Sequence, residues 1–399
     1  MDPVSNPFSP GAGNPPPELA GRSELLEQAR ITLGRVKAGR FEQSLMLVGL
    51  RGVGKTVLLN RIRDLAVADG YLVVMIEGTE MRSLPALLIP ALRQVLIQLD
   101  ALKDLSTKVK RGMQVLRSFI GAVKLKVGDI EVGLDIDPEQ GTADSGDLES
   151  DLADLFLAIG EAAQDRGRAV AVIIDEIQYL DETEMSALIM AMHRLSQRQS
   201  PMTLIAAGLP QLVGLAGRSK SYAERLFQYP AVGPLAVDDA RDALRDPLSR
   251  QGVAITDTAL DALVKVTRGY PYFIQEWGYQ VWNAAAASPI DIDAVQRATT
   301  AAIRKLDQSF FRVRFDRLTP REKEYLRALA ELGDGTHRSG DVAALLGVRI
   351  QSIAPLRSGL IRKGMIYSPQ HGDTAFTVPL FEEFMRRTMP DWRPPSYGT

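Results

Sequence analysis

The chain has 399 residues, of which 45% are hydrophobic and 24% are charged, and its formal net charge at pH 7 is −2. These values are typical of a globular protein of two or three domains, and they exclude a surface that is uniformly basic for nucleic acid binding. No apolar run is long enough to cross a membrane, and the lack of cysteine excludes disulfides and thiolate metal sites, so we expect a cytoplasmic protein without a membrane partner.

The first 20 residues are rich in Pro, Gly and Asn, which predicts a flexible or extended N-terminal arm rather than a signal peptide. Residues 21–232 then alternate short apolar runs with helical patterns, and this alternation favours a parallel α/β sheet. The strand candidates are residues 45–48, 71–76, 170–174 and 203–207. We therefore predict an α/β domain that begins directly after the arm.

A phosphate-binding motif lies between the first strand candidate and the helix that follows it. Residues 49–56 read Gly-Leu-Arg-Gly-Val-Gly-Lys-Thr and fit G-x-x-x-x-G-K-[ST]. Glycines let the backbone N–H groups point at phosphate oxygens, and the helix N-terminus adds positive potential. Lys55 is expected to reach the β- and γ-phosphates, and the Thr56 hydroxyl to bind Mg²⁺. The alternative is a glycine-rich turn with a surface lysine. The residues expected to contact the nucleotide here are Gly49, Gly52, Val53, Gly54, Lys55, Thr56 and Val57.

An insertion occupies residues 101–150, because this interval is longer than one strand and one helix require. It begins with a basic segment, and two runs of alternating apolar residues then flank Gly128-Asp129. Such a pattern predicts a β-hairpin with one apolar face, from about 123 to 136. The hairpin is either a structural addition at the domain edge or a surface that contacts DNA or a protein partner.

Two acidic residues, Asp175 and Glu176, follow the apolar run 169–174. A continuous apolar strand fits the centre of a parallel sheet, and α/β sheets bind ligands at the C-terminal ends of their strands. Asp175 is therefore predicted to hold the Mg²⁺ shell, and Glu176 to orient and deprotonate the attacking water. Acids at a strand end can also cap helices. The pairing with the phosphate-binding motif favours an ATP and Mg²⁺ site.

The C-terminal part of the chain divides into two further units. Residues 235–308 show only helical periodicity and predict a helical lid. In residues 315–390, three helical segments precede two short strand candidates, an order that resembles a winged helix-turn-helix, whose recognition helix reads DNA. The alternative is a protein-docking module. The residues of the third helix that we expect to face bases or phosphates are Arg349, Gln351, Ser352, Arg357, Arg362 and Lys363.

The order of elements resembles the AAA+ ATPases, and within them the branch of archaeal and eukaryotic replication initiators and their bacterial relatives. Residues 17–26, with Gly21 and Arg22, resemble the opening segment of that branch, which implies a place near the adenine. Arg225 stands where the family has its arginine finger, which acts on the nucleotide of a neighbouring subunit. The turn with Arg268 and Pro271 resembles the lid turn of archaeal-type and STAND ATPases.

Two positions depart from the family pattern. The fourth strand ends in Gly208, where many AAA+ proteins have a polar sensor of the γ-phosphate, and Thr203 and Gln211 are the candidate replacements. The lid arginine that usually contacts the γ-phosphate is not evident, which leaves Arg268 as its candidate. Both departures predict slow hydrolysis or a nucleotide switch.

The sequence thus predicts an ATP- and Mg²⁺-dependent ATPase with a P-loop α/β domain, a helical lid and a C-terminal winged helix. We expect it to form homo-oligomers. The leading function is an ATP-controlled initiator or loader that associates with double-stranded DNA. The alternative is a STAND-like signalling or defence switch whose winged helix docks a protein partner.

Overall fold

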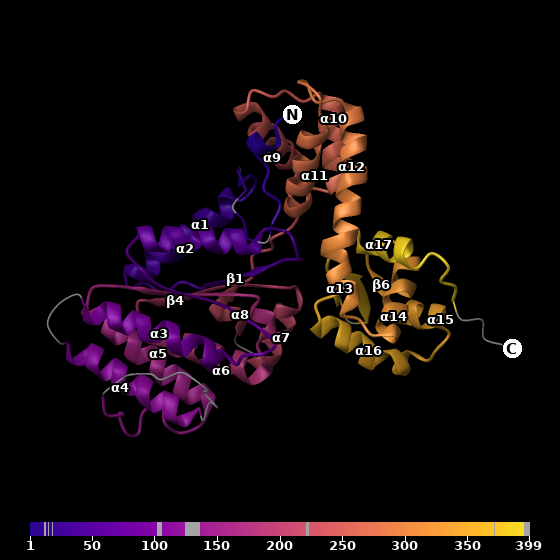
Figure 1. The fold of residues 1–399 in the computed structure, drawn as a ribbon. Coiled ribbons are helices and arrows are strands. Elements are labelled where there is room, and N and C mark those ends of the chain that lie inside the picture. Colours follow the sequence, from indigo (N-terminus) through magenta and orange to yellow (C-terminus); the bar gives the residue numbers. More distant parts are fainter. Residues whose placement is uncertain are drawn as a thin grey trace.

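The structure is a computed structural model that describes residues 1–11, 13–14, 16–17, 19–101, 106–123, 136–220, 223–370 and 372–394. An α/β domain comes first in the chain, a helical lid follows, and a smaller C-terminal domain ends it (Figure 1). Within these residues, no helix combines the length and the apolar character that crossing a membrane requires.

The α/β domain is built on a parallel sheet of five strands in the order β2-β3-β4-β1-β5. All residues of β3 and β4 are buried, because both strands are almost wholly apolar and have helices on both faces. The predicted strands are thereby confirmed, and the edge strand β5 is added to them. The strands are β1 (Ser44–Val48), β2 (Leu72–Glu77), β3 (Val170–Asp175), β4 (Met202–Gly208) and β5 (Phe227–Gln228).

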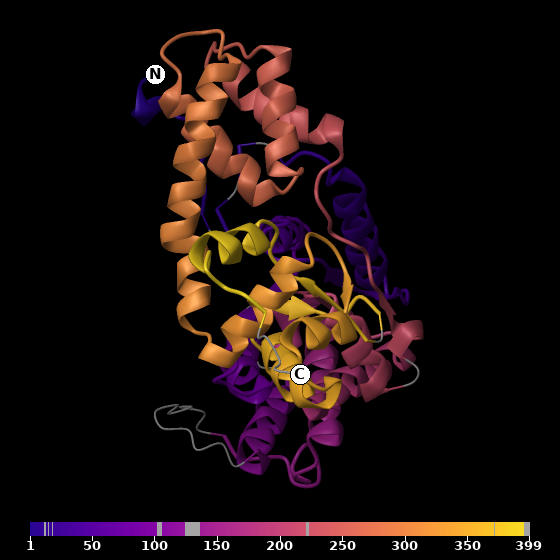
Figure 2. The same ribbon diagram turned by 90° about the vertical axis from the view of Figure 1, so that its right-hand side faces the viewer.

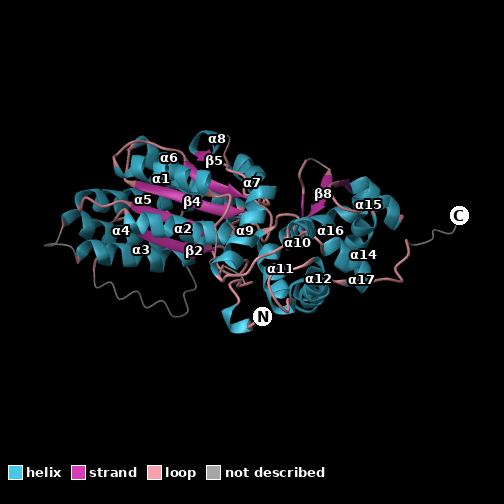
Figure 3. Ribbon diagram, turned by 90° about the horizontal axis from the view of Figure 1, so that it is seen from above, coloured by secondary structure: helices cyan, strands magenta, loops and turns pink. Residues whose placement is uncertain are grey.

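Helices cover the two faces of this sheet (Figures 1 and 3). Successive strand residues alternate between two hydrophobic cores, so that Met46 belongs to one core and Leu47 to the other. One face carries α1 (Ser23–Lys37) and α2 (Lys55–Ala68). The opposite face carries α3 (Leu84–Asp100), α5 (Leu148–Asp165) and α6 (Glu182–Gln197), and α7 (Gln211–Ser219) and α8 (Ala223–Leu226) follow β4.

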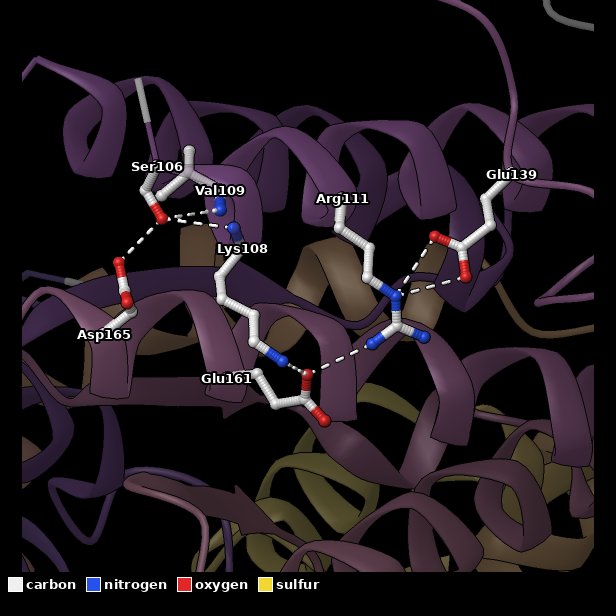
Figure 4. Close-up of polar contacts among 7 residues, drawn as sticks. All are labelled: Ser106, Lys108, Val109, Arg111, Glu139, Glu161 and Asp165. Atoms are coloured by element: carbon white, nitrogen blue, oxygen red, sulfur yellow. Dashed lines mark hydrogen bonds and ion pairs between the residues drawn. The ribbon is translucent and has the colours of Figure 1, made fainter. Parts of the chain in front are cut away.

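The insertion contributes a helix, α4 (Thr107–Ala122), which packs on α3 and α5 rather than on the sheet. Two of its basic side chains, Lys108 and Arg111, are paired with acids, as Figure 4 shows. The Lys108 ammonium lies 2.9 Å from the Glu161 carboxylate, and the Arg111 guanidinium lies 3.1 Å from Glu139 and from Glu161. The predicted hairpin lies almost entirely in residues 124–135, outside the described residues.

The lid consists of α9 (Val237–Arg250), α10 (Asp257–Thr267), α11 (Pro271–Ala284) and α12 (Ile292–Leu306). The long rod of α12 continues through a π-helical turn, η3 (Asp307–Phe311), into α13 (Arg312–Asp316), and so leads from the lid to the C-terminal domain (Figure 2).

The N-terminal arm, which the sequence predicted to be flexible or extended, lies along the lid. The Phe8 side chain is buried so closely against α11 that a Cβ at Gly278 would lie 2.5 Å from its ring. The Asn6 amide donates to the Tyr279 carbonyl oxygen at 3.0 Å, and the short turn η1 (Pro3–Ser5) precedes it. The arm is therefore extended but docked, because the Phe8 side chain is buried in the lid core.

The C-terminal domain has the element order of a winged helix. Three helices, α14 (Pro320–Glu331), α15 (Ser339–Leu346) and α16 (Ile350–Arg362), pack beside a three-stranded antiparallel sheet. The sheet has the order β6-β8-β7, with β6 (His337–Arg338), β7 (Ile366–Tyr367) and β8 (Asp373–Phe376). A final helix, α17 (Phe381–Thr388), packs on α14 and brings Phe381 against Phe311 of η3, which attaches the domain to the end of the lid.

Candidate nucleotide site

The phosphate-binding motif forms the loop between β1 and α2. Gly52 and Gly54 have φ angles of +83° and +90°, in a region that residues with a Cβ rarely adopt. α2 begins at Lys55, so its free N–H groups and the positive end of its dipole face the mouth of the loop. The loop therefore presents backbone donors to an anion, as the sequence predicted.

The Lys55 side chain is buried against the phosphate loop that precedes it. Its ammonium donates to the carbonyl oxygens of Gly49 and Leu50, both at 2.9 Å. Burial lowers the pKa of this ammonium to about 8, although Glu176 and Asp175 oppose the shift. The lysine is thus held by neutral carbonyl groups beside the cavity, and an incoming phosphate offers it a stronger, charged partner.

The end of β3 faces the start of α2. The Thr56 hydroxyl donates to an Asp175 carboxylate oxygen at 2.6 Å, and the other Asp175 oxygen accepts from the Glu176 N–H at 2.8 Å. Burial raises the pKa of the Asp175 carboxyl, and these two hydrogen bonds oppose that rise. A hydroxyl and a carboxylate that meet beside a phosphate loop are hard oxygen donors of the kind Mg²⁺ prefers. Thr56 and Asp175 therefore fit the predicted metal site.

Glu176 is held in an unusual backbone conformation. Its φ angle is +50°, in the left-handed region that costs energy for a residue with a side chain. One carboxylate oxygen accepts a hydrogen bond from the Gln178 amide, and the other lies 3.9 Å from the Arg51 guanidinium. Glu176 lines the cavity beside the phosphate loop, a position that would suit a general base.

Gln178 was missed by the sequence reasoning. Its side chain lies at the end of β4, where its amide oxygen accepts from the Leu209 N–H at 3.0 Å. The glycine at the strand end makes room for it, since a Cβ at Gly208 would lie 2.8 Å from that oxygen. The two expected candidates lie elsewhere: Thr203 is near the N-terminal end of β4, and Gln211 begins α7. The sequence signal for this contact was Gly208, because a residue without a side chain at the strand end leaves space for the side chain of a neighbouring segment.

A cavity of about 260 Å³ opens beside these groups, between the α/β domain, the lid and the arm. Its walls combine the phosphate loop with side chains from distant parts of the chain. The lining residues include Gly13, Arg22, Gly52, Val53, Gly54, Lys55, Thr56, Val57, Glu176, Pro271, Tyr272, Phe310 and Arg314.

Arg22 and Pro271 attach the neighbouring segments to the phosphate loop. The buried Arg22 guanidinium donates to the Val53 carbonyl oxygen at 3.2 Å, and burial lowers its pKa. Gly21 lies beside Asp239 of the lid. Pro271 is the first residue of α11, and the next N–H in the chain, that of Tyr272, donates to the Gly52 carbonyl oxygen at 3.1 Å. The lid helix is thus seated directly on the loop.

Arg268 and Arg225 do not line the cavity. The Arg268 guanidinium is paired with three carboxylates of the C-terminal domain, at 2.7 Å from Asp334, 3.5 Å from Glu382 and 3.2 Å from Glu383. It therefore binds the lid to that domain in this structure and is not placed to sense a phosphate. Arg225 is exposed on α8, directly before the edge strand β5.

The six residues predicted to face DNA divide into two groups. Arg357 donates to Thr374, Ser368 and the Asp373 carbonyl oxygen, all within the C-terminal domain. Lys363 is paired with Glu322 at 2.7 Å. Arg357 is therefore only partly exposed, whereas Lys363 is exposed, and both have partners within the domain itself. The remaining four residues, Arg349, Gln351, Ser352 and Arg362, are exposed.

Comparison with known families identifies the α/β domain. Residues 18–205 match the AAA ATPase domain, and residues 308–385 match a domain of unknown function (DUF8462). The part of the chain that carries the phosphate loop is therefore an AAA ATPase domain, as its motifs predicted. Among curated proteins, no sequence matches this chain.

Solved structures share the fold at low sequence identity. A Walker-type ATPase of Pyrococcus abyssi is 16% identical, with a TM-score of 0.56, over 92% of this chain and 96% of that one. The Holliday junction branch migration motor RuvB of Thermotoga maritima is 16% identical, with a TM-score of 0.45, over 91% and 96%. The Orc1 protein of Aeropyrum pernix, solved with DNA, is 16% identical, with a TM-score of 0.46, over 94% of both chains. The first likeness establishes a common fold, and the two weaker ones carry no argument about function.

Proposed function

We propose that this protein binds and hydrolyses ATP and that the bound nucleotide controls how its C-terminal domain is held. Arg51, in the variable part of the phosphate loop, supports the proposal best. Its N–H donates to the Thr377 carbonyl oxygen of the C-terminal domain at 3.3 Å. Its guanidinium lies 3.9 Å from the Glu176 carboxylate and so close to the C-terminal domain that a Cβ at Gly364 would lie 2.6 Å from it. One residue thus contacts both the nucleotide site and the C-terminal domain.

The residues of the site suit hydrolysis of a phosphoanhydride bond. Glu176 orients a water molecule and accepts its proton as the water oxygen attacks the γ-phosphorus, and the bond to the β-phosphate oxygen breaks to give ADP and phosphate. Lys55 exchanges the Gly49 and Leu50 carbonyl oxygens for phosphate oxygens. Thr56 and Asp175 would hold Mg²⁺, which would neutralise phosphate charge.

ATP binding is expected to weaken the contact of Arg51 with the C-terminal domain, because a terminal phosphate competes for its guanidinium. Hydrogen exchange tests this in the Glu176→Gln protein, which retains ATP. Amides of residues 364–377 should exchange faster with ATP than without it, and the Lys55→Ala protein should show no such change. ATP binding with unchanged exchange in this segment would reduce the proposal to an ATPase without a coupled domain.

Self-association and a DNA-associated role of initiator or loader type remain a second candidate. The exposed position of Arg225 supports self-association. The DNA-associated role is supported by four exposed residues of the C-terminal domain, Arg349, Gln351, Ser352 and Arg362. If Arg225 acts on a neighbouring subunit, mixing Arg225→Ala protein with Lys55→Ala protein should restore part of the ATPase activity that each lacks. ATPase activity per subunit that does not depend on protein concentration, with no recovery on mixing, would indicate a self-sufficient monomer.

A further inference from the structure

Arg314 is a cation of the cavity that neither the phosphate motif nor the lid turn explains. It lies on α13, the short helix between the π-helical turn and the C-terminal domain. Its side chain is partly buried and lines the nucleotide cavity. It also lines a second cavity of about 590 Å³ between the α/β and C-terminal domains, and Arg51 is the other cation that lines both. The two arginines thus form part of the wall between the nucleotide and the domain junction.

The contacts of Arg314 leave its charge without an anion. Its guanidinium donates to the Phe310 carbonyl oxygen at 2.6 Å and lies 3.9 Å from the centroid of the Phe310 ring. Within the part of the chain that the structure describes, no carboxylate is paired with it. Arg312, two residues earlier on the same helix, is by contrast exposed and paired with Asp316 at 3.0 Å.

The surroundings of Arg314 disfavour its charge. Burial first, and then the nearby positive charge of Arg51, lower the pKa of the guanidinium to about 10. A buried cation that faces a second cation is costly unless an anion lies between or beside them. The anion that this cavity is built to hold is the phosphate chain of a nucleotide, and guanidinium groups bind phosphate with two parallel hydrogen bonds.

A stack of two rings fixes the position from which Arg314 acts. Phe310 stacks on Tyr272 with ring centroids 4.6 Å apart, and the Tyr272 N–H is bonded to the phosphate loop at Gly52. This contact holds η3, directly before α13, beside the loop. The Arg314 guanidinium therefore enters the cavity from a segment outside the lid turn. That turn is where the sequence led us to look for such an arginine, and its Arg268 is already paired with acids.

We propose that Arg314 binds the terminal phosphate of ATP and thereby distinguishes ATP from ADP. The inference deepens the proposed function and depends on it, because it assigns the residue that reads the γ-phosphate. α13 leads directly into α14, so an arginine held by the phosphate also fixes the segment that connects the lid to the C-terminal domain. Arg51 loosens one contact with that domain, whereas Arg314 ties its connecting segment to the nucleotide.

The affinities of ATP and ADP, measured by titration in the Glu176→Gln background to prevent hydrolysis, test this assignment. Arg314→Gln should weaken ATP binding about tenfold to a hundredfold and leave ADP binding nearly unchanged, because a charge-assisted hydrogen bond to the γ-phosphate is lost. Arg314→Lys keeps the charge and should restore part of the preference. Arg312→Gln, the matched control on the same helix, should bind both nucleotides as the parent does.

Equal losses of ATP and ADP affinity in Arg314→Gln, or an unchanged ratio of the two, would overturn the inference, since a residue that only packs against Phe310 cannot sense one phosphate. The melting temperature of each variant shows whether a loss of affinity comes from misfolding. Arg314→Lys provides the second test if Arg314→Gln is unstable. Failure of the proposed function has a different signature: the parent protein itself would then bind no ATP. If it does bind ATP, and Lys55→Ala does not, only the role of Arg314 is in question.

Discussion

The nucleotide site and helix α16 were both predicted from charged residues in short stretches of sequence, yet they differ in what those residues do. In the site, Lys55, Asp175 and Glu176 converge on one cavity and its rim. On α16 and at its C-cap, Arg357 and Lys363 form a hydrogen bond and an ion pair within their own domain. A motif that fixes backbone conformation also fixes where its side chains lie. A helix with scattered cations leaves each side chain free to find the nearest partner.

Burial explains why the two regions differ. Lys55 and Asp175 are buried charged groups, and such groups are retained where a ligand or a specific partner requires them. The cations of α16 lie at a partly solvated surface, where an intramolecular carboxylate or hydroxyl is as good a partner as an external phosphate. The largest effects of substitution are therefore expected in the site and the smallest on α16.

Lys55→Ala should have the largest effect on ATP binding, a loss of at least about a hundredfold, because it removes the charge that the phosphate loop directs at the phosphates. Titration with a fluorescent ATP analogue measures this. Lys37→Ala is a matched control, since this lysine is exposed and its ammonium donates to the Asp69 carbonyl oxygen at 2.6 Å, away from the residues that line the cavity. Tight ATP binding by the Lys55→Ala protein would show that the loop is a glycine-rich turn and not the phosphate site.

Glu176→Gln should leave ATP affinity within a few fold and reduce the rate of hydrolysis by about 10²–10⁴, the usual contribution of a general base. Binding depends on the loop and the metal ligands, whereas the chemistry depends on the carboxylate. Single-turnover hydrolysis and equilibrium binding, measured on the same protein, separate the two. Equal losses in both measurements would assign Glu176 to binding rather than to catalysis.

Local patterns were enough to predict strands β1 to β4, the phosphate loop and the Asp175-Glu176 pair. Each of these depends on residues that are adjacent in sequence, such as the fully apolar β3 or the glycines that permit positive φ angles. The element order of the C-terminal domain was also predictable, because Thr319 and Glu322 form a capping box that marks the start of α14.

Contacts between distant segments could not be predicted in this way. Gln178 reaches the end of β4 because the sheet places β3 and β4 side by side. Its hydrogen-bond partner, Leu209, is 31 residues away in the sequence. Arg314 enters the cavity because the lid folds back onto the loop, and the arm docks because Phe8 finds α11. Arg268 misled the sequence reasoning for the same reason, since its carboxylate partners lie 66 and 115 residues away.

Gln178→Ala should have an intermediate effect, a fall of about tenfold in the rate of hydrolysis with little change in ATP affinity. The side chain links the Glu176 carboxylate to the Leu209 N–H, so its loss leaves the base less well oriented by removing one hydrogen bond to a charged group. The rate and the affinity, measured as for Glu176→Gln, show whether the effect is confined to chemistry. An unchanged rate would mean that Arg51 alone orients Glu176.

The smallest effects are expected on α16, and they decide whether its exposed side binds DNA. If it does, duplex binding should weaken with salt, with a log–log slope of about −0.9 for each phosphate contact. The Arg349→Ala, Arg362→Ala double variant should then reduce that slope by about two units without changing thermal stability, because both side chains are exposed.

The Arg357→Ala, Lys363→Ala double variant provides the contrast on the same helix. It removes the bonds to Thr374 and the Asp373 carbonyl oxygen and the pairing with Glu322, and so should lower the melting temperature while leaving the salt slope of any DNA binding unchanged. A reduced slope in this variant at an unchanged melting temperature would reverse the assignment. Duplex binding that neither pair alters would exclude α16 as the DNA surface. Because the exposed part of this helix also carries Ile350, at 47% exposure, the protein-docking alternative would then be the better explanation of that surface.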